Sequence, residues 1–296
     1  MIKTYLVFDI GGTVIKYGYL NEQGEIIDKD EFISELTDLD IFIDTLSKIY
    51  FESKYEIKGI ALSCPGVINT KTGVIKTIVA YPYLEGICLT KMLSKACNGI
   101  KVTIENDAKC AGLAEMWCGN GVNYKDAVVI VLGTGIGGVV IKDKKIHHGA
   151  NLFAGEISNV IVDYDESQCK IVTWSDIAST KALCKRVARV LGIDNINGRE
   201  IFELVKQKDK KVTQVLSSFC FDIAIQLYNL QYMYDPEIIC IGGGISRQEI
   251  LIDMINDAVM SIYNQTSQLL IPKVVGCKHY NEANLIGALY HHIMAK

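Results

Sequence analysis

Three glycine-rich turns follow apolar runs of the sequence, and each could contact a phosphate group. They are Asp9 to Thr13 (DIGGT), Gly133 to Gly138 (GTGIGG) and Gly242 to Gly244 (GGG). Glycine lets backbone N–H groups approach an anion closely, because no Cβ intervenes and positive φ is accessible. The second turn has four glycines and a threonine in six residues, which is more glycine than a hairpin requires. The turns therefore predict phosphate contacts.

The first turn carries an aspartate inside an apolar strand. A carboxylate in the position of Asp9 is costly unless it has a partner, and a hydrated Mg²⁺ beside ATP phosphates is a suitable one. A plain hairpin is the alternative, since Gly11-Gly12 is also a good hairpin sequence. This turn alone leaves both interpretations open.

The third turn precedes a predicted helix, which is a geometry suited to a nucleotide. It lacks the G-x-G-x-x-G spacing, so a dinucleotide fold is a weak interpretation. No G-x-x-x-x-G-K-[ST] motif occurs in the chain, which excludes a P-loop enzyme. The protein-kinase motifs are absent too.

Asn106 and Asp107 stand between a predicted strand and a predicted helix. Both residue types are preferred N-caps, so the pair could simply begin the helix Ala108 to Cys118. In the functional interpretation Asp107 is a general base that deprotonates a sugar hydroxyl, and Asn106 binds a neighbouring hydroxyl. Phosphoryl transfer needs positioning, charge neutralisation and one base near the attacking oxygen. The location between two phosphate-type turns favours the functional interpretation.

Two further loops contain candidate sugar contacts. Ser63 to Gly66 (SCPG) ends a predicted strand and could place backbone groups over a sugar, although an ordinary turn has the same composition. Gly155-Glu156 follows the second glycine turn, and its carboxylate could accept hydrogen bonds from hydroxyl groups. A lone loop glutamate is otherwise solvated surface.

The elements expected to position these residues form two related α/β halves. Each half opens with a strand, a glycine turn and a second strand: Tyr5–Ile10 and Val14–Leu20, then Ala127–Leu132 and a strand from Val139. Further strands are expected at Glu25–Ile33, Lys58–Cys64, Lys101–Glu105, Glu237–Ile241 and Lys273–Val275. Helices are expected at Asp40–Tyr50, Leu89–Ala96, Ala108–Cys118, Ser175–Leu191, Gly198–Gln207, Val212–Tyr234, Gln248–Tyr263 and Glu282–Met294.

Composition excludes several classes of protein. With 296 residues, 49% of them hydrophobic and 22% charged, the chain is globular and long enough for two domains. Its net charge of −4 argues against a nucleic-acid partner. The longest uncharged apolar stretch, Ala127 to Ile141, is too short for a membrane span and contains four glycines. We expect a cytoplasmic protein, because no export signal is visible and the ten scattered cysteines form no C-x-x-C pair.

Taken together and in order, these motifs resemble the ROK family of sugar kinases over essentially the whole chain. Asp9 to Thr13 is similar to its first phosphate loop, Ser63 to Gly66 to its sugar loop, and Glu105 to Ala108 to its E-N-D-A base motif. Gly133 to Gly138 is similar to its second phosphate loop. The remaining matches are Gly155-Glu156, to the G-E of the family signature, and Gly242 to Gly244, to its adenosine loop.

The resemblance implies an α/β fold of two actin-like (ribonuclease H-like) lobes with an interdomain cleft. The N-terminal lobe would comprise residues 1–120 plus 281–296, and the C-terminal lobe residues 121–280. The implied reaction transfers the γ-phosphate of ATP to the C6 hydroxyl of a hexose or hexoside of the glucose, N-acetylmannosamine or β-glucoside class. The implied partners are a sugar, ATP with Mg²⁺, and a second copy of the chain in a homodimer.

The resemblance also implies a role for each matched residue. Asp107 would be the catalytic base, and Asp9 would meet Mg²⁺ through the ATP phosphates. The implied sugar ligands are Pro65, Gly66, Asn106, Asp107, Glu156 and Asn159. The implied ATP contacts are Asp9, Gly11, Gly12, Thr13, Gly133, Thr134, Gly135, Gly137, Gly138, Gly242, Gly243 and Gly244.

The sequence departs from the family in one region. Most ROK kinases follow G-E with x-G-H and a cysteine-rich zinc segment that ends in a sugar-binding glutamate. Here Asn159 occupies the histidine position, and Ser175 or Asp176 occupies the glutamate position. The segment between them has the single cysteine Cys169, and one thiolate cannot build a structural zinc site. We therefore expect no structural zinc and relaxed recognition at the C1 end of the sugar, as in a zinc-lacking subgroup that includes β-glucoside kinases and N-acetylmannosamine kinases.

Other functions remain as alternatives to a kinase. A catalytically silent sugar-binding sensor of the same fold would keep the loops without turnover. A DNA-binding repressor of the family carries a helix-turn-helix ahead of its first lobe, and we expect none because Asp9 follows only eight residues. An ATPase that acts on proteins would have no reason for the E-N-D-A base.

Overall fold

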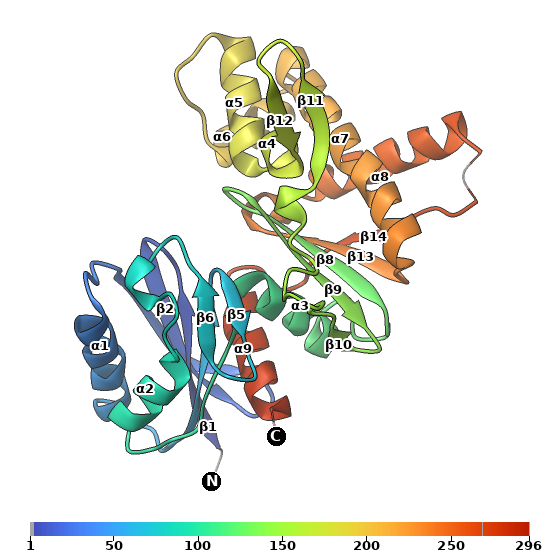
Figure 1. The fold of residues 1–296 in the computed structure, drawn as a ribbon. Helices are drawn as coiled ribbons and strands as arrows, with labels where there is room; N and C mark the ends of the chain where they lie inside the picture. Colours follow the sequence, from blue (N-terminus) through green and yellow to red (C-terminus); the bar gives the residue numbers. More distant parts are fainter. Residues whose placement is uncertain (1–2, 268, 296) are drawn as a thin grey trace. The chain divides into compact units, whose positions relative to one another are not determined.

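The computed structural model describes residues 3–267 and 269–295. The chain forms two compact units (Figure 1). Unit 1 holds the chain up to Trp117, the segment Gly149–Phe153 and the chain from Glu282 on, and unit 2 holds Cys118–His148 and Ala154–Asn281. The lobe boundaries expected from the sequence, residues 1–120 plus 281–296 and residues 121–280, stay a prediction.

The sheet of unit 1 has five strands in the order β3-β2-β1-β4-β7. Its strands are β1 Thr4–Ile10, β2 Val14–Asn21, β3 Ile26–Ile33, β4 Ile57–Cys64 and β7 Val102–Asn106. The first three form the predicted antiparallel meander, whereas β4 runs parallel to both β1 and β7. The registers place Asp9 opposite Ser63 and Ser63 opposite Glu105. Three candidate loops therefore leave the sheet at the same edge.

Each face of this sheet is covered by helices. Leu6, Ile60 and Ile104 belong to the buried cluster that includes residues of α1 (Leu39–Phe51) and α2 (Leu89–Ala96). The residues between them in the strands point to the opposite face, because side chains alternate along a strand. The C-terminal helix α9 (Ala283–Met294) packs there against β4, β7 and β1. The hairpin of β5 (Val67–Asn69) and β6 (Val74–Thr77), followed by η1 (Pro82–Leu84), completes this unit (Figure 1).

Small residues let α9 approach its neighbours closely. A Cβ on Gly287 would lie 1.7 Å from the carbonyl oxygen of Cys110 in α3 (Asp107–Cys118), and a Cβ on Gly59 would lie 2.2 Å from the ring of His292. That ring is buried at 3% exposure, and its Nδ1 lies 2.9 Å from the hydroxyl of Thr103. The helix is therefore fixed directly on strands β4 and β7.

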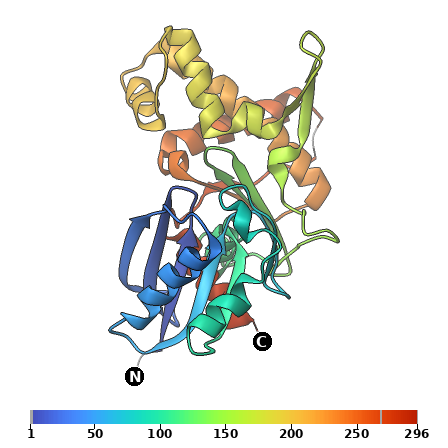
Figure 2. The same ribbon diagram turned by 60° about the vertical axis from the view of Figure 1, so that its left-hand side comes forward.

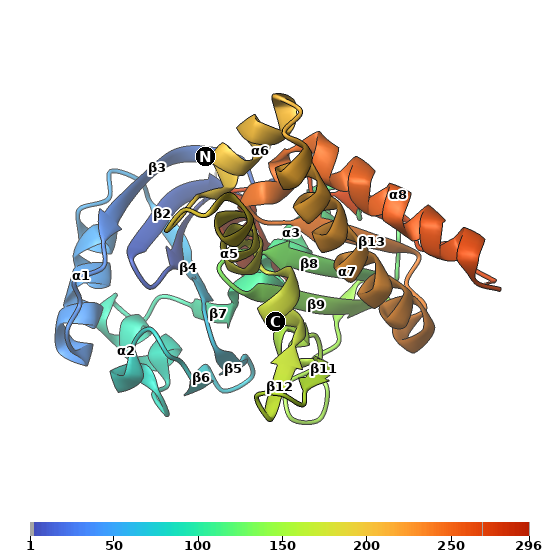
Figure 3. The same ribbon diagram turned by 90° about the horizontal axis from the view of Figure 1, so that it is seen from above.

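Unit 2 is built on a second five-stranded sheet in the order β10-β9-β8-β13-β14. Its strands are β8 Ala127–Leu132, β9 Ile136–Lys142, β10 Lys145–Ile146, β13 Ile238–Gly242 and β14 Val274–Gly276. Its helices are α4 Trp174–Ala178, α5 Thr180–Leu191, α6 Gly198–Lys206, α7 Lys210–Tyr234 and α8 Glu249–Gln265, with short turns η2 Ile157–Asn159 and η3 Gly244–Arg247. Helices α7 and α8 pack side by side (Figure 3).

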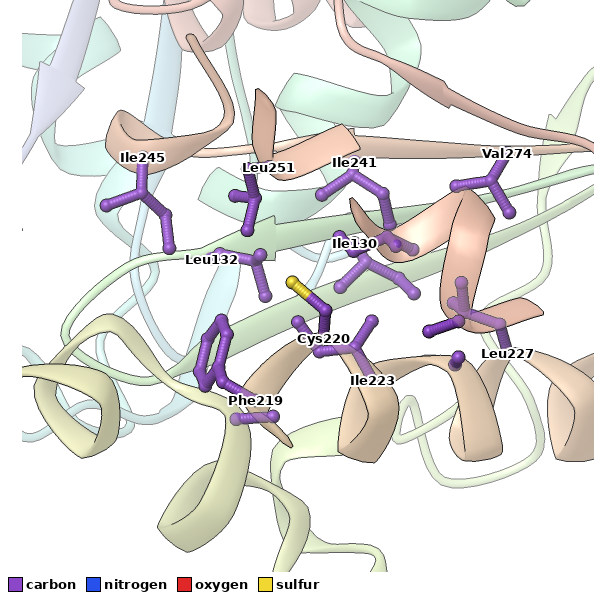
Figure 4. Packing of buried hydrophobic residues seen from close by; sticks show 14 of the residues in the cluster. Ile130, Leu132, Phe219, Cys220, Ile223, Leu227, Ile241, Ile245, Leu251 and Val274 are labelled. Atoms are coloured by element: carbon purple, nitrogen blue, oxygen red, sulfur yellow. The ribbon is translucent and has the colours of Figure 1, made fainter. Parts of the chain in front are cut away.

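The core of unit 2 joins that helix pair to the sheet. Figure 4 shows Phe219, Cys220 and Ile223 of α7 against Ile130 of β8 and Ile241 of β13, and none of these side chains is exposed. β8 and β13 are parallel neighbours buried on both faces, which explains their continuous apolar sequences. The second and third glycine turns follow the carboxyl ends of these two strands.

Three details differ from the sequence-based expectation. β9 begins at Ile136 rather than Val139, because Gly137 and Gly138 pair with Val131 and Ile130 in the ladder and so belong to a strand. The helix expected over Ser175–Leu191 is broken at Ser179, which caps α5 by accepting a hydrogen bond from the Ala182 N–H. A hairpin of β11 (Ile161–Asp165) and β12 (Lys170–Thr173) was not expected, and it projects from unit 2 (Figure 2).

None of the ten cysteines forms a disulfide, and six of them are buried. Of the helices in the described part of the chain, none combines the length and the apolar character that crossing a bilayer requires.

Burial of His292 predicts a stability that depends on pH. Desolvation lowers the pKa of this imidazole from 6.5 to about 4. Between these values the unfolded chain binds a proton that the folded chain does not, so stability is complete above pH 6.5 and falls as the pH falls toward 4. At about 1.4 kcal/mol per pKa unit, the loss is on the order of 3 kcal/mol.

We expect the variant His292→Gln to lose this part of the pH dependence. Urea unfolding of both proteins between pH 4 and 7, followed by circular dichroism, measures it. Equal slopes of unfolding free energy against pH in the two proteins would contradict the assignment.

Candidate active site

Asp9 stands at the carboxyl end of β1 with its carboxylate anchored on one oxygen. Its Oδ1 accepts hydrogen bonds from the Ser63 hydroxyl and the Asn284 side-chain amide, both at 2.9 Å. Burial raises the pKa of Asp9 above 3.8, and the nearby charge of Asp107 adds to this, although the two hydrogen bonds lower it. A carboxylate desolvated to this extent would be stabilised by a cation at its other oxygen.

The turn after Asp9 presents its tip to solvent. The Gly11 N–H donates to the Val14 carbonyl at 3.2 Å, and the Tyr81 hydroxyl donates to the Gly11 carbonyl. Gly12 and Thr13 are exposed at the tip. The turn is thus a hairpin, as in the alternative interpretation, and its fixed base leaves an accessible tip that could also meet a phosphate.

Asn106 both caps α3 and holds the candidate base. Its Oδ1 accepts from the Lys109 N–H at 3.1 Å, and its Nδ2 donates to the Gly66 carbonyl at 3.0 Å and to Asp107 Oδ1 at 2.9 Å. The helix cap expected from the sequence is therefore present, and the roles of the pair in sugar binding and catalysis stay a prediction. Because Asn106 is buried at 5% exposure and both of its amide hydrogens are engaged, its geometry favours positioning over direct sugar binding.

Asp107 is held in place by two hydrogen bonds to a single oxygen. The Ala108 N–H donates to Oδ1 at 2.8 Å, beside the bond from Asn106. Burial raises the pKa of Asp107 above 3.8, while these two bonds and the charge of Lys109 act in the opposite direction. A carboxylate with a raised pKa is a stronger base than a solvated one, which suits proton abstraction.

The loop at Pro65-Gly66 is shaped by a glycine that no other residue could replace without movement. Gly66 has φ +97°, and a Cβ there would lie 2.0 Å from the Thr77 carbonyl oxygen. The Gly66 carbonyl accepts the hydrogen bond from the Asn106 side-chain amide, so this loop is joined directly to the start of α3. Pro65 and Gly66 are half-buried.

Two buried charged residues lie beside this group of hydrogen bonds, and the sequence analysis gave neither of them a role of its own. Glu105 has no exposed surface; its Oε1 accepts from the Asn106 N–H at 2.8 Å, and its Oε2 lies 3.9 Å from His291 Nδ1. Lys109 also has no exposed surface, and its Nζ donates to the Leu152 carbonyl at 3.3 Å. A lysine in a helical sequence predicts a solvent-exposed position, so the burial of Lys109 could not be predicted from the sequence.

The second glycine turn in unit 2 is tied to the start of α5. The Gly133 carbonyl accepts from the Thr180 N–H at 2.9 Å, and the Gly133 N–H donates to the Gly135 carbonyl at 2.9 Å. The Thr180 hydroxyl donates to the Leu132 carbonyl at 3.2 Å. Thr134 and Gly135 are left exposed at the tip.

The third glycine turn packs beside the second. Gly243 has φ +97°, and a Cβ there would lie 2.2 Å from the Leu132 carbonyl oxygen. Gly242 is buried against Cys277, whereas Gly244 faces open space. The two turns therefore meet through backbone atoms.

Both turns open into one pocket of about 830 Å³ in unit 2. Gly133, Thr134 and Gly244 line it, and three cations, Lys181, Arg199 and Arg247, join them. Arg247 also stacks on the Tyr280 ring at 4.9 Å. The remaining lining residues are Leu132, Thr180, Cys184, Ile196, Asn197, Gly198, Phe202, Ile245, Gln248 and Asn281. Sequence analysis found only the turns, because many of the other residues come from α5, α6 and the loop between these helices, far from both turns in the sequence.

Gly138 and Gly155 bring the signature loop against β9. A Cβ on Gly138 would lie 2.7 Å from the Gly155 carbonyl oxygen, and Gly155 itself has φ +88°. Glu156 follows at half-buried depth, and Asn159 is exposed at the end of η2. Gly137 and Gly138 thus belong to the strand rather than to the tip of the turn, and Gly138 also packs on the signature loop.

Comparison with known proteins identifies the family. A sequence profile of the ROK family matches residues 5–293. The chain belongs to the ROK family. A β-glucoside kinase of Listeria monocytogenes is 31% identical over 297 residues, with 96% of this chain and 95% of that protein covered. An N-acetyl-D-glucosamine kinase of Photobacterium profundum is 27% identical, with 98% and 99% covered.

A solved structure shows the same fold. A ROK family protein from Streptococcus pneumoniae TIGR4, crystallised in complex with sucrose, has a TM-score of 0.89 and 31% identity, with 98% of each chain covered. The expected α/β fold with two actin-like lobes is confirmed by this match. Family and relatives together support sugar kinase function for this ROK protein.

Asp176 is committed to a helix cap in this ROK chain. Its Oδ2 accepts from the Thr173 N–H at 3.0 Å and the Thr173 hydroxyl at 2.8 Å, and these bonds lower the pKa of Asp176. One of its two carboxylate oxygens therefore serves the cap of α4. Ser175 lies closer to the second turn, with its hydroxyl 3.4 Å from the position that a Cβ on Gly135 would take.

ROK kinases use ATP with a metal ion, commonly Mg²⁺. Asp9 fits a hydrated Mg²⁺, because its buried carboxylate has one oxygen engaged by neutral donors and favours a cation at the other. Within residues 3–267 and 269–295, no three His, Cys, Asp or Glu side chains gather into a metal-binding group. The lack of structural zinc stays a prediction.

Asp9→Asn should increase stability while decreasing activity. The neutral amide keeps an oxygen for Ser63 and Asn284 but removes the cost of burying a charge. Because the folded-state pKa of Asp9 is raised, the wild type loses stability as the pH rises through that value, whereas the variant does not. Melting temperatures at pH 4 and pH 7 measure this; about 2–4 °C corresponds to 1 kcal/mol in a chain of this size class. A difference that does not grow toward pH 7 would contradict the argument.

Proposed function

We propose that this chain transfers the γ-phosphate of Mg·ATP to the C6 hydroxyl of a hexoside, with β-glucosides as the preferred class. The observation that carries the proposal is the Asp107 carboxylate, held on one oxygen at the carboxyl end of β7. Its pinned Oδ1 orients Oδ2 for a substrate hydroxyl. Phosphoryl transfer asks the protein for one such base together with positioning and charge neutralisation.

Asp107 would take the proton of the C6 hydroxyl as that oxygen attacks the γ-phosphorus, and the bond from this phosphorus to the β,γ-bridging oxygen breaks, with ADP as the leaving group. The raised pKa of the carboxyl improves the match to a hydroxyl proton, and the bond from Asn106 stabilises the ionised form. Pro65, Gly66, Glu156 and Asn159 are the proposed sugar contacts, with Asn106 acting chiefly through Asp107 and Gly66. Bound Mg²⁺ would neutralise phosphate charge, and Asp9 is the residue proposed to hold it.

The pocket of unit 2 is the proposed ATP site. Its exposed turn residues Thr134 and Gly244 offer backbone groups to phosphates, and Gly135 is exposed next to Thr134. Gly11, Gly12 and Thr13 are the proposed phosphate contacts of unit 1. Lys181, Arg199 and Arg247 provide positive charge around the nucleotide. Five further glycines hold the turns in place through the backbone contacts described above: Gly133, Gly137, Gly138, Gly242 and Gly243.

The preference for glycosides rests on the C1 end of the site. Asp176 is used by its helix cap, and Asn159 replaces the family histidine on an exposed turn. A site that does not hydrogen-bond a free anomeric hydroxyl accepts a substituted one. The β-glucoside kinase and the sucrose-bound protein are relatives of this chain whose named ligands both carry a substituent at C1.

A coupled ADP-release assay with Mg·ATP tests the substrate class. The panel is glucose, N-acetylmannosamine, N-acetylglucosamine, fructose, mannose, cellobiose and an aryl β-glucoside. We expect the highest kcat/KM on the last two sugars, and phosphate at C6 by NMR of the product. Turnover restricted to free hexoses would overturn the glycoside preference, and no turnover despite ATP binding would favour the silent sensor.

The control for this assay is Asp107→Ala. Removal of a general base should lower kcat by about 10²–10⁴-fold, while nucleotide binding stays within error of the wild type. Retained turnover in this variant would exclude Asp107 as the base.

Gly243→Ala tests the ATP pocket. The added Cβ would meet the Leu132 carbonyl at 2.2 Å, so the third turn must move and the affinity for ATP should fall by about tenfold or more. The matched control is Gly192→Ala at the end of α5, which has φ +69° but no atom within 4 Å of its Cβ. Calorimetric titration with a non-hydrolysable ATP analogue should separate the two variants; equal affinities would place the nucleotide elsewhere.

A further inference from the structure

Five consecutive residues belong to a different unit from the residues on either side of them. Gly149–Phe153 belongs to unit 1 by its contacts, although His148 before it and Ala154 after it belong to unit 2. The Ala154 N–H donates to the His148 carbonyl at 3.2 Å and closes this loop at its base. The loop is therefore a short, closed structure whose tip is held by residues of unit 1.

The buried lysine of α3 holds that tip. Lys109 has no exposed surface and is among the largest fully buried side chains. Its Nζ donates to the Leu152 carbonyl at 3.3 Å. Burying an ammonium group is costly unless it has partners, and the Leu152 carbonyl is one of the partners of Lys109. An apolar side chain would serve packing alone at lower cost.

The backbone of Leu152 shows that the loop is constrained. Its φ is +72°, a left-handed conformation that is unfavourable for a residue other than glycine. Such a conformation persists only where the surrounding contacts determine it, and these sites gather at ligand-binding segments. The hydrogen bond from Lys109 is a contact of that kind.

Covalent geometry connects the loop to the candidate sugar ligand. Glu156 is four residues after Leu152, so their Cα atoms lie within about 14 Å of each other. Lys109 is two residues after Asp107 in the first turns of α3. Within unit 1, one side chain thus joins the helix that bears the base to the segment that precedes the glutamate in the sequence.

We propose that Lys109 is a positioning residue, which fixes Leu152 to the base helix and thereby sets the place of Gly155-Glu156 for sugar binding. This inference rests on the proposed function. It makes sugar affinity, rather than the chemical step, depend on a lysine that touches neither substrate.

Two other roles for Lys109 give different signatures. If its charge acted mainly on Asp107, its removal would change kcat and leave the sugar KM unchanged. If its role were structural alone, its removal would lower the melting temperature and leave both constants unchanged. Only the positioning role raises the sugar KM at constant kcat and constant ATP KM.

The test is Lys109→Met, which keeps the length of the side chain but removes its charge and donor. We expect the sugar KM to rise by about tenfold, with kcat within about twofold of the wild type. The matched control is Lys142→Met in unit 2, whose Nζ also donates to a main-chain carbonyl, that of Tyr234, at 3.3 Å. That variant should keep both constants. An unchanged sugar KM in Lys109→Met would overturn the proposal.

A second readout does not need turnover. Hydrogen exchange over residues 149–156 should be faster in Lys109→Met than in the wild type and unchanged in Lys142→Met; equal exchange would overturn the proposal. Leu152→Gly, which relaxes the left-handed residue, serves if Lys109→Met does not fold, with the same expected rise in KM. Wild-type protein without turnover on any sugar would contradict the proposed function alone, and calorimetric Kd values for glucose and 4-nitrophenyl β-glucoside would then replace KM.

Discussion

The parallel register of β1, β4 and β7 is the constraint on which the candidate site of unit 1 depends. It places Asp9, Ser63 and Glu105 on neighbouring rungs of one sheet. Parallel strands end at the same edge, so the turn after Asp9, the loop at Gly66 and the start of α3 are adjacent without any further device. The hydrogen bonds from Ser63 to Asp9 and from Asn106 to Gly66 follow from this register.

The same edge concentrates charge where water is scarce. Burial raises the pKa values of Asp9 and Asp107, and it leaves Glu105 and Lys109 without exposed surface. Each group is held by hydrogen bonds to neighbouring strands or loops, because an unpaired buried charge would destabilise the unit strongly. The region is therefore less stable than an apolar equivalent, and its carboxylates are more reactive for that reason. Stability and reactivity are set here by one property, the local exclusion of solvent.

Local sequence predicted the parts of this arrangement that depend on neighbours along the chain. The strand before Asp9, the glycine turns and the capped start of α3 are specified by a few adjacent residues. Other features depend on partners far away in the sequence. Gly137 and Gly138 have the sequence of a turn, but they pair with β8 as part of a strand. Lys109 has the sequence environment of a surface lysine, but its side chain contacts Leu152. The pocket of unit 2 likewise joins α5, α6 and two turns, whose approach no short motif encodes.

Asn106 and Asp176 show what separates a helix cap from a functional residue. Both side chains take part in a helix cap, Asn106 at the start of α3 and Asp176 in the capping box with Thr173, although the sequence analysis expected a cap only at Asn106 and Asp107. All hydrogen bonds of Asp176 in the described structure stay within its own cap, on Thr173. Asn106 uses its oxygen for the cap and its amide for two other groups, Gly66 and Asp107. A cap that also joins two loops transmits the position of the helix to the base, and this second use makes Asn106 part of the site while Asp176 remains part of the scaffold.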